Sequence, residues 1–155
     1  MDFFHFLALV IVISPISLFI HEWGHVIGAK FIHAEYIKLS IGMGKPLCRL
    51  LCFRNVIIEV NQIFFLGAST ESKRNKPLLA KDHILISFMG PLVSLIVAIL
   101  CYYLAWFLKD TYLYLTALFN LWLSIINSIP FKFGRKQSDG YTILKWLLKY
   151  TKYKL

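Results

Sequence analysis

Residues 3–31 read FFHFLALVIVISPISLFIHEWGHVIGAKF. Up to Ile20 the stretch is apolar except for one histidine, two serines and one proline, and it then runs into a polar cluster. As a continuous helix it would be about 43 Å long, which exceeds the bilayer core of about 30 Å. The sequence therefore predicts a first membrane span over residues 3–32, with the polar cluster near the end of that span.

The polar cluster is the motif His21-Glu22-Trp23-Gly24-His25. Residues i and i+4 share one face of a helix, so both imidazoles can bind the same metal ion. Glu22 is offset by about 100° from His21 and can reach a water molecule on that metal. Zinc held by two histidines and one carboxylate keeps an open position, where the pKa of water falls to about 7. The motif predicts a zinc site that activates water.

The same motif also occurs by chance on the polar face of ordinary soluble helices. Here the preceding run is strongly apolar. Ionisable groups at membrane depth are costly and by default mark a functional site. The spacing argues against a heme site, because histidines one helical turn apart cannot occupy opposite axial positions on one heme. We therefore favour the metal site.

The 17 Lys and Arg residues are segregated along the chain. None precedes Lys30, nine lie in residues 30–81, one is Lys109 and seven lie in residues 132–154. This is the positive-inside pattern of membrane proteins rather than a nucleic-acid-binding patch. It predicts an external N-terminus, with residues 34–82 and the C-terminus in the cytoplasm. With a hydrophobic content of 58%, the chain is expected to be an integral protein of a bacterial plasma membrane.

The three cysteines do not indicate a disulfide framework. Cys48 and Cys52 fall in the predicted cytoplasmic segment, where thiols stay reduced. A Cys-x3-Cys pair without further Cys or His nearby is a poor zinc signature, so the pair is given no role. Cys101 lies within an apolar run and is predicted to be a packing residue.

The cytoplasmic segment, residues 34–82, is predicted to form a small sheet at the membrane surface. Its composition predicts a glycine-rich turn at residues 41–46. Two strands follow at residues 47–53 and 56–65, joined by Arg54-Asn55. The sheet is predicted to end at residues 66–68, and residues 71–76 form a charged loop. One edge of this sheet pairs with an extended peptide, or else the sheet is a structural cap. The sequence does not decide between the two.

Two further spans are predicted over residues 83–108 and 112–131. The predicted fold is an all-α polytopic membrane protein with three transmembrane helices and a small β-hairpin, forming one domain over residues 1–155. Asn120 and Ser124, which share one face of the third span, are predicted to join helices. The tail, residues 141–155, is predicted to be a basic amphipathic helix on the anionic inner leaflet.

The predicted zinc site needs a third protein ligand. Most other carboxylates are on the wrong side of the membrane, in the predicted sheet or charged loop, or too close to the motif in the chain. Asp82 precedes the second span on the correct side and stays an alternative. Asp139 is also on that side, follows a polar helix end and precedes Gly140, which permits a tight turn. It is the better candidate on sequence grounds.

Several segments, in this order, resemble the site-2 protease family of intramembrane zinc metalloproteases. They are His21-Glu22-Trp23-Gly24-His25, Ser40-Ile41-Gly42-Met43-Gly44, Gly90-Pro91-Leu92, and Asn127-x-x-Pro130 with Asp139-Gly140. One departure is that eleven residues separate Asn127 from Asp139, because residues 131–138 look like an insertion. The chain is expected to be close to a minimal core of the family, without an added regulatory domain.

The resemblance implies one Zn²⁺ bound by His21, His25 and Asp139, with Glu22 as general base and acid. It implies that Asn127 positions the unwound substrate or the oxyanion. It also implies that Gly42 and Gly44 belong to a loop that holds the substrate. The substrate would be a membrane-embedded protein or peptide, such as a transmembrane or leader segment, cleaved near its cytoplasmic end.

Two other functions share features with this sequence. A zinc protease of the prenyl-protein-processing type usually takes its third ligand from a glutamate on a later helix, and the predicted spans offer no such glutamate. A membrane module that binds a metal or peptide without hydrolysis would not need Glu22. The partners expected are the substrate and the lipid bilayer, with no nucleic acid.

Overall fold

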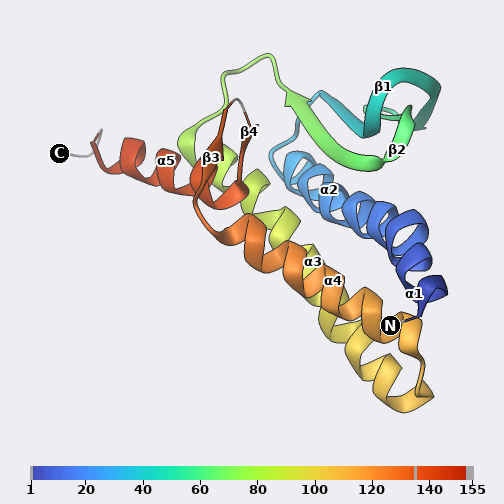
Figure 1. Ribbon diagram of the computed structural model, residues 1–155. Helices are drawn as coiled ribbons and strands as arrows, with labels where there is room; N and C mark the ends of the chain where they lie inside the picture. The colour runs from blue at the N-terminus through green and yellow to red at the C-terminus, as the bar shows by residue number, and fades with distance from the viewer. Residues whose placement is uncertain (1, 135, 153–155) are drawn as a thin grey trace.

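The computed structural model describes residues 2–134 and 136–152, and it is mostly helical. Two long helical segments, one ending in α2 (Ser14–Phe31) and the other being α3 (Ala80–Leu108), lie close together at one end and diverge toward the other (Figure 1). α4 (Thr111–Ser128) runs back along α3. A curled hairpin, formed by β1 (Tyr36–Phe53) and β2 (Val56–Lys73), covers one side of α2 (Figure 1). α5 (Asp139–Lys152) extends sideways from the start of α3 and the end of α4.

The first helical segment is continuous from α1 (Phe3–Ala8) through the π-helical turn η1 (Leu9–Ile13) to α2 (Ser14–Phe31). Pro15 is the second residue of α2, and only Ser14 separates it from the π turn. Proline has no N–H to donate and its ring crowds the preceding turn, so the wider π turn accommodates it inside a helix. The result is one uninterrupted helix that carries the histidine motif in its last third.

Gly24 and Gly28 let α2 lie directly against α3 (Ala80–Leu108). A Cβ on Gly28 would be 2.9 Å from the Ile86 Cα, and one on Gly24 would be 2.8 Å from the Gly90 Cα. Both contacts are to backbone, which cannot move aside as a flexible side chain does. This close approach brings α3 beside the histidines.

α4 (Thr111–Ser128) follows α3 after a sharp turn. Lys109 adopts a left-handed conformation that ends α3, and Asp110 caps α4 by accepting a hydrogen bond of 2.8 Å from the Leu113 N–H. Between α4 and α2, the buried Asn120 amide donates a hydrogen bond of 2.8 Å to the Ser17 hydroxyl, so Asn120 joins these two helices as predicted.

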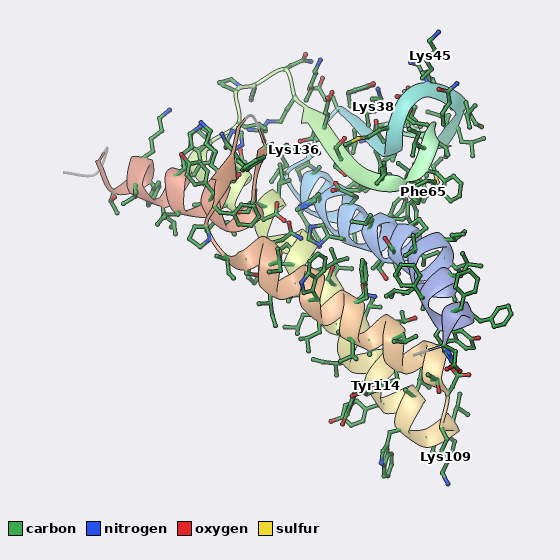
Figure 2. The ribbon with its side chains drawn as sticks, viewed as in Figure 1. Lys38, Lys45, Phe65, Lys109, Tyr114 and Lys136 are labelled. Carbon is green, nitrogen blue, oxygen red and sulfur yellow. The ribbon has the colours of Figure 1, made fainter. Side chains whose placement is uncertain are left out.

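Among the described residues, two helical segments are long and apolar enough to span a membrane, Phe3–Phe31 and Ala80–Leu108. α4 is shorter than the predicted span over residues 112–131, because it ends at Ser128, two residues before Pro130. Lys38, Lys45 and Lys136 lie toward the end of the molecule opposite Lys109 (Figure 2), in keeping with the segregation of basic residues along the chain.

The sheet is larger than predicted and corrects the all-α description. β1 (Tyr36–Phe53) and β2 (Val56–Lys73) have 18 residues each. The segment 66–68 does not end the sheet, the predicted charged loop begins inside β2, and the predicted turn at residues 41–46 is a bend within β1. Gly42 and Gly44 have φ values of 82° and 97°, which only glycine adopts without strain, and so permit that bend.

The hairpin curls back on itself, which explains its length. Residues 37–41 pair with residues 72–68 in antiparallel order and also with residues 56–60. Both halves of β2 therefore lie beside the start of β1. The buried cluster formed by Val26, Ala29, Ile32, Ala34, Ile37, Leu39 and Val56 attaches this curled sheet to α2.

A short hairpin links α4 to α5 (Asp139–Lys152). Its strands are β3 (Lys132–Phe133) and β4 (Lys136–Gln137), and it occupies most of the predicted insertion. The Ser138 hydroxyl donates to the Ile129 carbonyl at 2.7 Å and accepts from the Phe131 N–H at 3.0 Å. This serine thus closes the base of the hairpin and places the next residue, Asp139, at the start of α5.

Candidate metal centre

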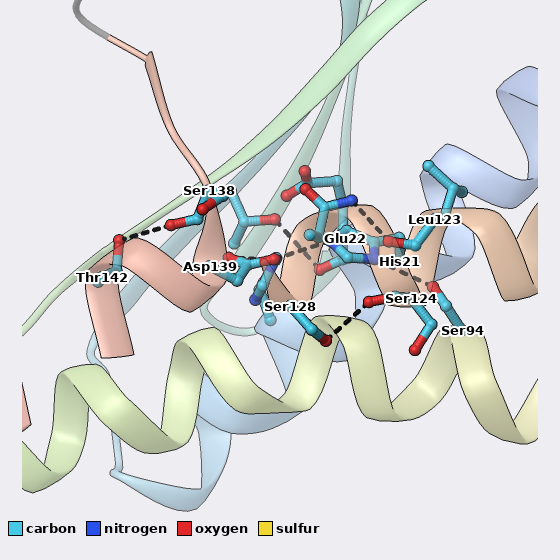
Figure 3. A network of polar contacts seen from close by, with 12 residues as sticks. His21, Glu22, Ser94, Leu123, Ser124, Ser128, Ser138, Asp139 and Thr142 are labelled. Carbon is cyan, nitrogen blue, oxygen red and sulfur yellow. Dashed lines mark hydrogen bonds and ion pairs between the residues drawn. The ribbon is translucent and has the colours of Figure 1, made fainter. Parts of the chain in front are cut away.

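His21 projects from α2 toward Ser94 of α3 and Asp139 of α5 (Figure 3), and His25, one turn further along α2, also contacts both of these helices. Their rings are 5.0 Å apart between centroids, and both are buried. The possible ligand atoms of His21, Glu22 and His25 all lie within 4.8 Å of one another. The helical spacing thus produces the grouping that the motif predicts.

The Nδ1 atoms of both imidazoles contact α3. The Nδ1 of His21 is 3.0 Å from the Ser94 hydroxyl, and the Nδ1–H of His25 donates to the Ile86 carbonyl at 2.8 Å. A proton held on Nδ1 leaves the lone pair of Nε2 free for a metal. The two rings are therefore oriented with both Nε2 atoms turned toward the same space.

Asp139 enters that space from α5. One of its carboxylate oxygens is 3.1 Å from the His21 Nε2, and the other is 3.4 Å from the His25 Nε2. Ligand atoms placed tetrahedrally about 2.0–2.1 Å from a zinc ion lie about 3.3 Å apart. The three side chains thus have the spacing and chemistry of a zinc ligand set.

Gly90 provides room for the histidine rings. A Cβ at this position would collide with the imidazole of His25 and would lie 3.0 Å from the His21 Nε2. The Gly90-Pro91 segment of α3 is therefore the floor of the site, which explains why a glycine is needed in the middle of this long helix.

Asp139 is held in place by its neighbours on both sides. The Ser138 hydroxyl accepts from the Tyr141 N–H at 3.1 Å, which caps α5, and Gly140 lies so close to Ser128 that a Cβ would be 2.6 Å from the Ser128 carbonyl carbon. Burial raises the pKa of the Asp139 carboxyl, but the neighbouring imidazoles of His21 and His25 outweigh burial and hold that pKa below its usual range. The group is therefore an ionised carboxylate suited to a cation.

Asp82, the alternative third ligand, is committed to other partners. Its carboxylate accepts from the Arg74 guanidinium at 2.9 Å and from the Leu79 N–H at 2.9 Å, which caps α3. The same arginine donates to the Ile32 carbonyl at 3.0 Å. Asp82 thus joins the end of α2 to the start of α3 and is not brought together with the histidines.

A cavity of 490 Å³ opens beside the three side chains and Glu22. Asn127, at the end of α4, lines it, and its amide also donates to the Leu123 carbonyl at 2.9 Å. Gly42 and Gly44 are not among the described residues that line this cavity, and their predicted substrate role stays a prediction. On the side of the β1–β2 hairpin, the cavity wall is formed by Gly67–Thr70 of β2.

Sequence reasoning missed this wall. The run Gly67-Ala68-Ser69-Thr70 consists of small residues, which leave space beside a strand, and that run was the available signal. The Thr70 hydroxyl donates to the Glu22 carbonyl at 3.1 Å. The end of β2 is thus joined directly to the helix that carries the motif.

Comparison with known proteins tests the resemblance. No curated protein matches the sequence. The family model of peptidase family M50 matches residues 6–112, more than half of the chain and the part that contains the histidine motif, whereas Asn127 and Asp139 lie beyond the match. This match shows that the chain belongs to peptidase family M50, the site-2 protease family.

Proposed function

We propose that the protein is a zinc-dependent intramembrane endopeptidase that cleaves a transmembrane or leader segment of a membrane protein or peptide. Family membership implies intramembrane metalloprotease activity at the family level. The observation that supports the finer proposal is the convergence of His21, His25 and Asp139 beside Glu22 in one cavity.

The chain's own residues have distinct roles in this proposal. His21, His25 and Asp139 would hold the metal, which when bound supplies a Lewis acid that acidifies water and polarises the scissile carbonyl. Glu22 takes a proton from the attacking water and returns it to the leaving amine nitrogen. Asn127, on the cavity wall, would orient the unwound peptide or donate to the developing oxyanion.

The substrate must be extended at the cleavage site, because a helix keeps its peptide bonds hydrogen-bonded and shielded. The wall formed by Gly67–Thr70 is the end of a strand, and a peptide lying along it would be in the extended conformation. The hydrogen bond from Thr70 to the Glu22 carbonyl ties this strand to the catalytic helix, which supports a fixed distance between the peptide and the base.

The membrane arrangement belongs to the same proposal. α4 would form the third crossing, since it runs back along the apolar α3 and its 18 residues span about 27 Å. The N-terminus would then be external and the site near the cytoplasmic side, the side that carries most of the basic residues.

The test is the Glu22→Gln variant, co-expressed or reconstituted with a candidate membrane substrate. We expect zinc content to be unchanged and cleavage to fall by at least about a hundredfold, because general acid–base catalysis contributes about 10²–10⁴. If Glu22→Gln cleaves as fast as the parent, the hydrolytic role is wrong and a module that only binds metal or peptide becomes the better account.

A further inference from the structure

The exposed surface of α5 is divided into an apolar stripe and a basic stripe. Leu144, Leu147 and Leu148 are 44%, 45% and 63% exposed, and their i, i+3, i+4 spacing makes one continuous apolar stripe. Lys145 and Lys149, also exposed and spaced i, i+4, form the neighbouring basic stripe. The partly buried Trp146 instead packs against α3, on a face of α5 that neither exposed stripe occupies.

The contact between α5 and α3 fixes the level of α5 relative to the membrane. The Trp146 ring stacks on the His83 ring with centroids 4.1 Å apart and planes 3° from parallel. His83 lies in the first turn of α3, next to the ion-paired Asp82, which is where an apolar span meets the aqueous boundary. α5 therefore lies at the membrane–water interface, where tryptophan is favoured, and it extends sideways from the spans (Figure 1).

A helix at this level meets lipid headgroups along one side. Residues 140–155 contain no Asp or Glu, so every charged side chain of α5 after Asp139 is a lysine. The Lys149 ammonium is 4.7 Å from the centre of the Trp146 ring, which keeps this charge close to the interface. An apolar stripe beside a basic stripe suits a bilayer that carries anionic headgroups.

We propose that anionic lipid headgroups bind Lys145 and Lys149 while the leucine stripe enters the bilayer, and that this docking holds Asp139 at the metal centre. Asp139 is the first residue of α5, and Gly140 is in tight backbone contact with Ser128, so a tilt of α5 displaces the carboxylate. The coupling to the metal rests on the proposed function. The lipid contact itself does not.

The depth of α5 can be measured without any metal. The full chain, with Cys48, Cys52 and Cys101 changed to serine, receives Leu147→Cys and a fluorescent label. It is placed in two kinds of lipid nanodisc, one of phosphatidylcholine alone and one of phosphatidylcholine with phosphatidylglycerol. In discs of phosphatidylcholine with phosphatidylglycerol, we expect quenching by spin-labelled lipid and protection from aqueous iodide. Adding Lys145→Gln and Lys149→Gln should weaken the lipid quenching. A label that iodide reaches freely in both discs overturns the proposal and assigns the stripe to a protein partner.

The coupling is measured as zinc affinity in the same two discs. Phosphatidylglycerol should raise the affinity of the parent by about threefold or more, since each basic residue near an anionic surface contributes appreciably. The Lys145→Gln/Lys149→Gln variant should lose this gain. Lys45→Gln/Lys76→Gln, which removes the same charge from the β1–β2 hairpin and the loop after it, should keep it. An equal lipid effect in both double variants overturns the assignment to α5.

The two proposals fail in different ways. A parent that binds no zinc in either disc overturns the proposed function and the coupling with it, while the quenching data still decide whether α5 docks on anionic lipid. A label buried equally in both discs, with no effect of the lysine changes, overturns the role of anionic headgroups.

Discussion

Removal of the Ser94 hydroxyl should weaken metal binding without removing a ligand. Ser94 is fully buried on α3, and its oxygen is 3.0 Å from the His21 Nδ1. In Ser94→Ala, the Nδ1–H of His21 loses its acceptor in a place that bulk water does not reach. A buried polar group left without a partner costs about 1–3 kcal/mol, and the loss of a hydrogen-bond partner of a metal ligand typically lowers metal affinity by about 10–100-fold. We expect zinc affinity to fall by about tenfold or more.

The assay is competition for zinc between the purified protein and a chelator of known affinity. Ser87→Ala is the matched control, because it removes a buried hydroxyl from the same helix and leaves the partners of both histidines in place. Nitrogen NMR of the histidine rings adds a second readout, since His21 should lose its preference for the Nδ1–H tautomer. If Ser94→Ala and Ser87→Ala bind zinc equally well, Ser94 does not orient His21 and this reasoning is refuted.

Three further predictions follow from contacts described above. Asp139→Ala should abolish stoichiometric zinc binding while Asp82→Ala keeps it and lowers thermal stability, and metal analysis showing the reverse would exchange the two roles. Gly28→Ala should cost about 1–3 kcal/mol in detergent unfolding, because its Cβ meets the backbone of α3 at 2.9 Å, and an unchanged midpoint would contradict the close approach. Hydrogen bonding from Lys38 lowers the pKa of the Glu59 carboxyl, so its stabilisation is present above the ordinary pKa of about 4.5 and is lost as pH falls through the lower folded value. Glu59→Gln should remove that pH dependence, as measured by limited proteolysis of the β1–β2 hairpin between neutral and acidic pH.

Features that depend on local spacing could be predicted from the sequence. His21 and His25 lie one turn apart, so their grouping required only the geometry of a helix. Gly24 and Gly28 are also four residues apart, and this spacing places both of them on the face of α2 that meets α3. The family match confirmed the resemblance that these motifs carried.

Features that depend on distant pairing could not be predicted in the same way. The curled hairpin was underestimated because Ile37 pairs with both Val56 and Ser72, and composition does not reveal a strand that has two neighbours. For the third ligand, chain position left both Asp82 and Asp139. The difference between them is the contact of Asp82 with Arg74, which exists only in the folded protein.

The distance along the chain between the predicted ligands has a consequence for the order in which the molecule is made. His21 and Asp139 are 118 positions apart, so ribosomal synthesis produces the histidine motif early and the carboxylate late. Until α5 has emerged and settled beside α2 and α3, only part of the ligand set exists. A nascent chain already inserted in the bilayer would therefore hold metal weakly, and proteolytic capacity would arise only after the helices have assembled.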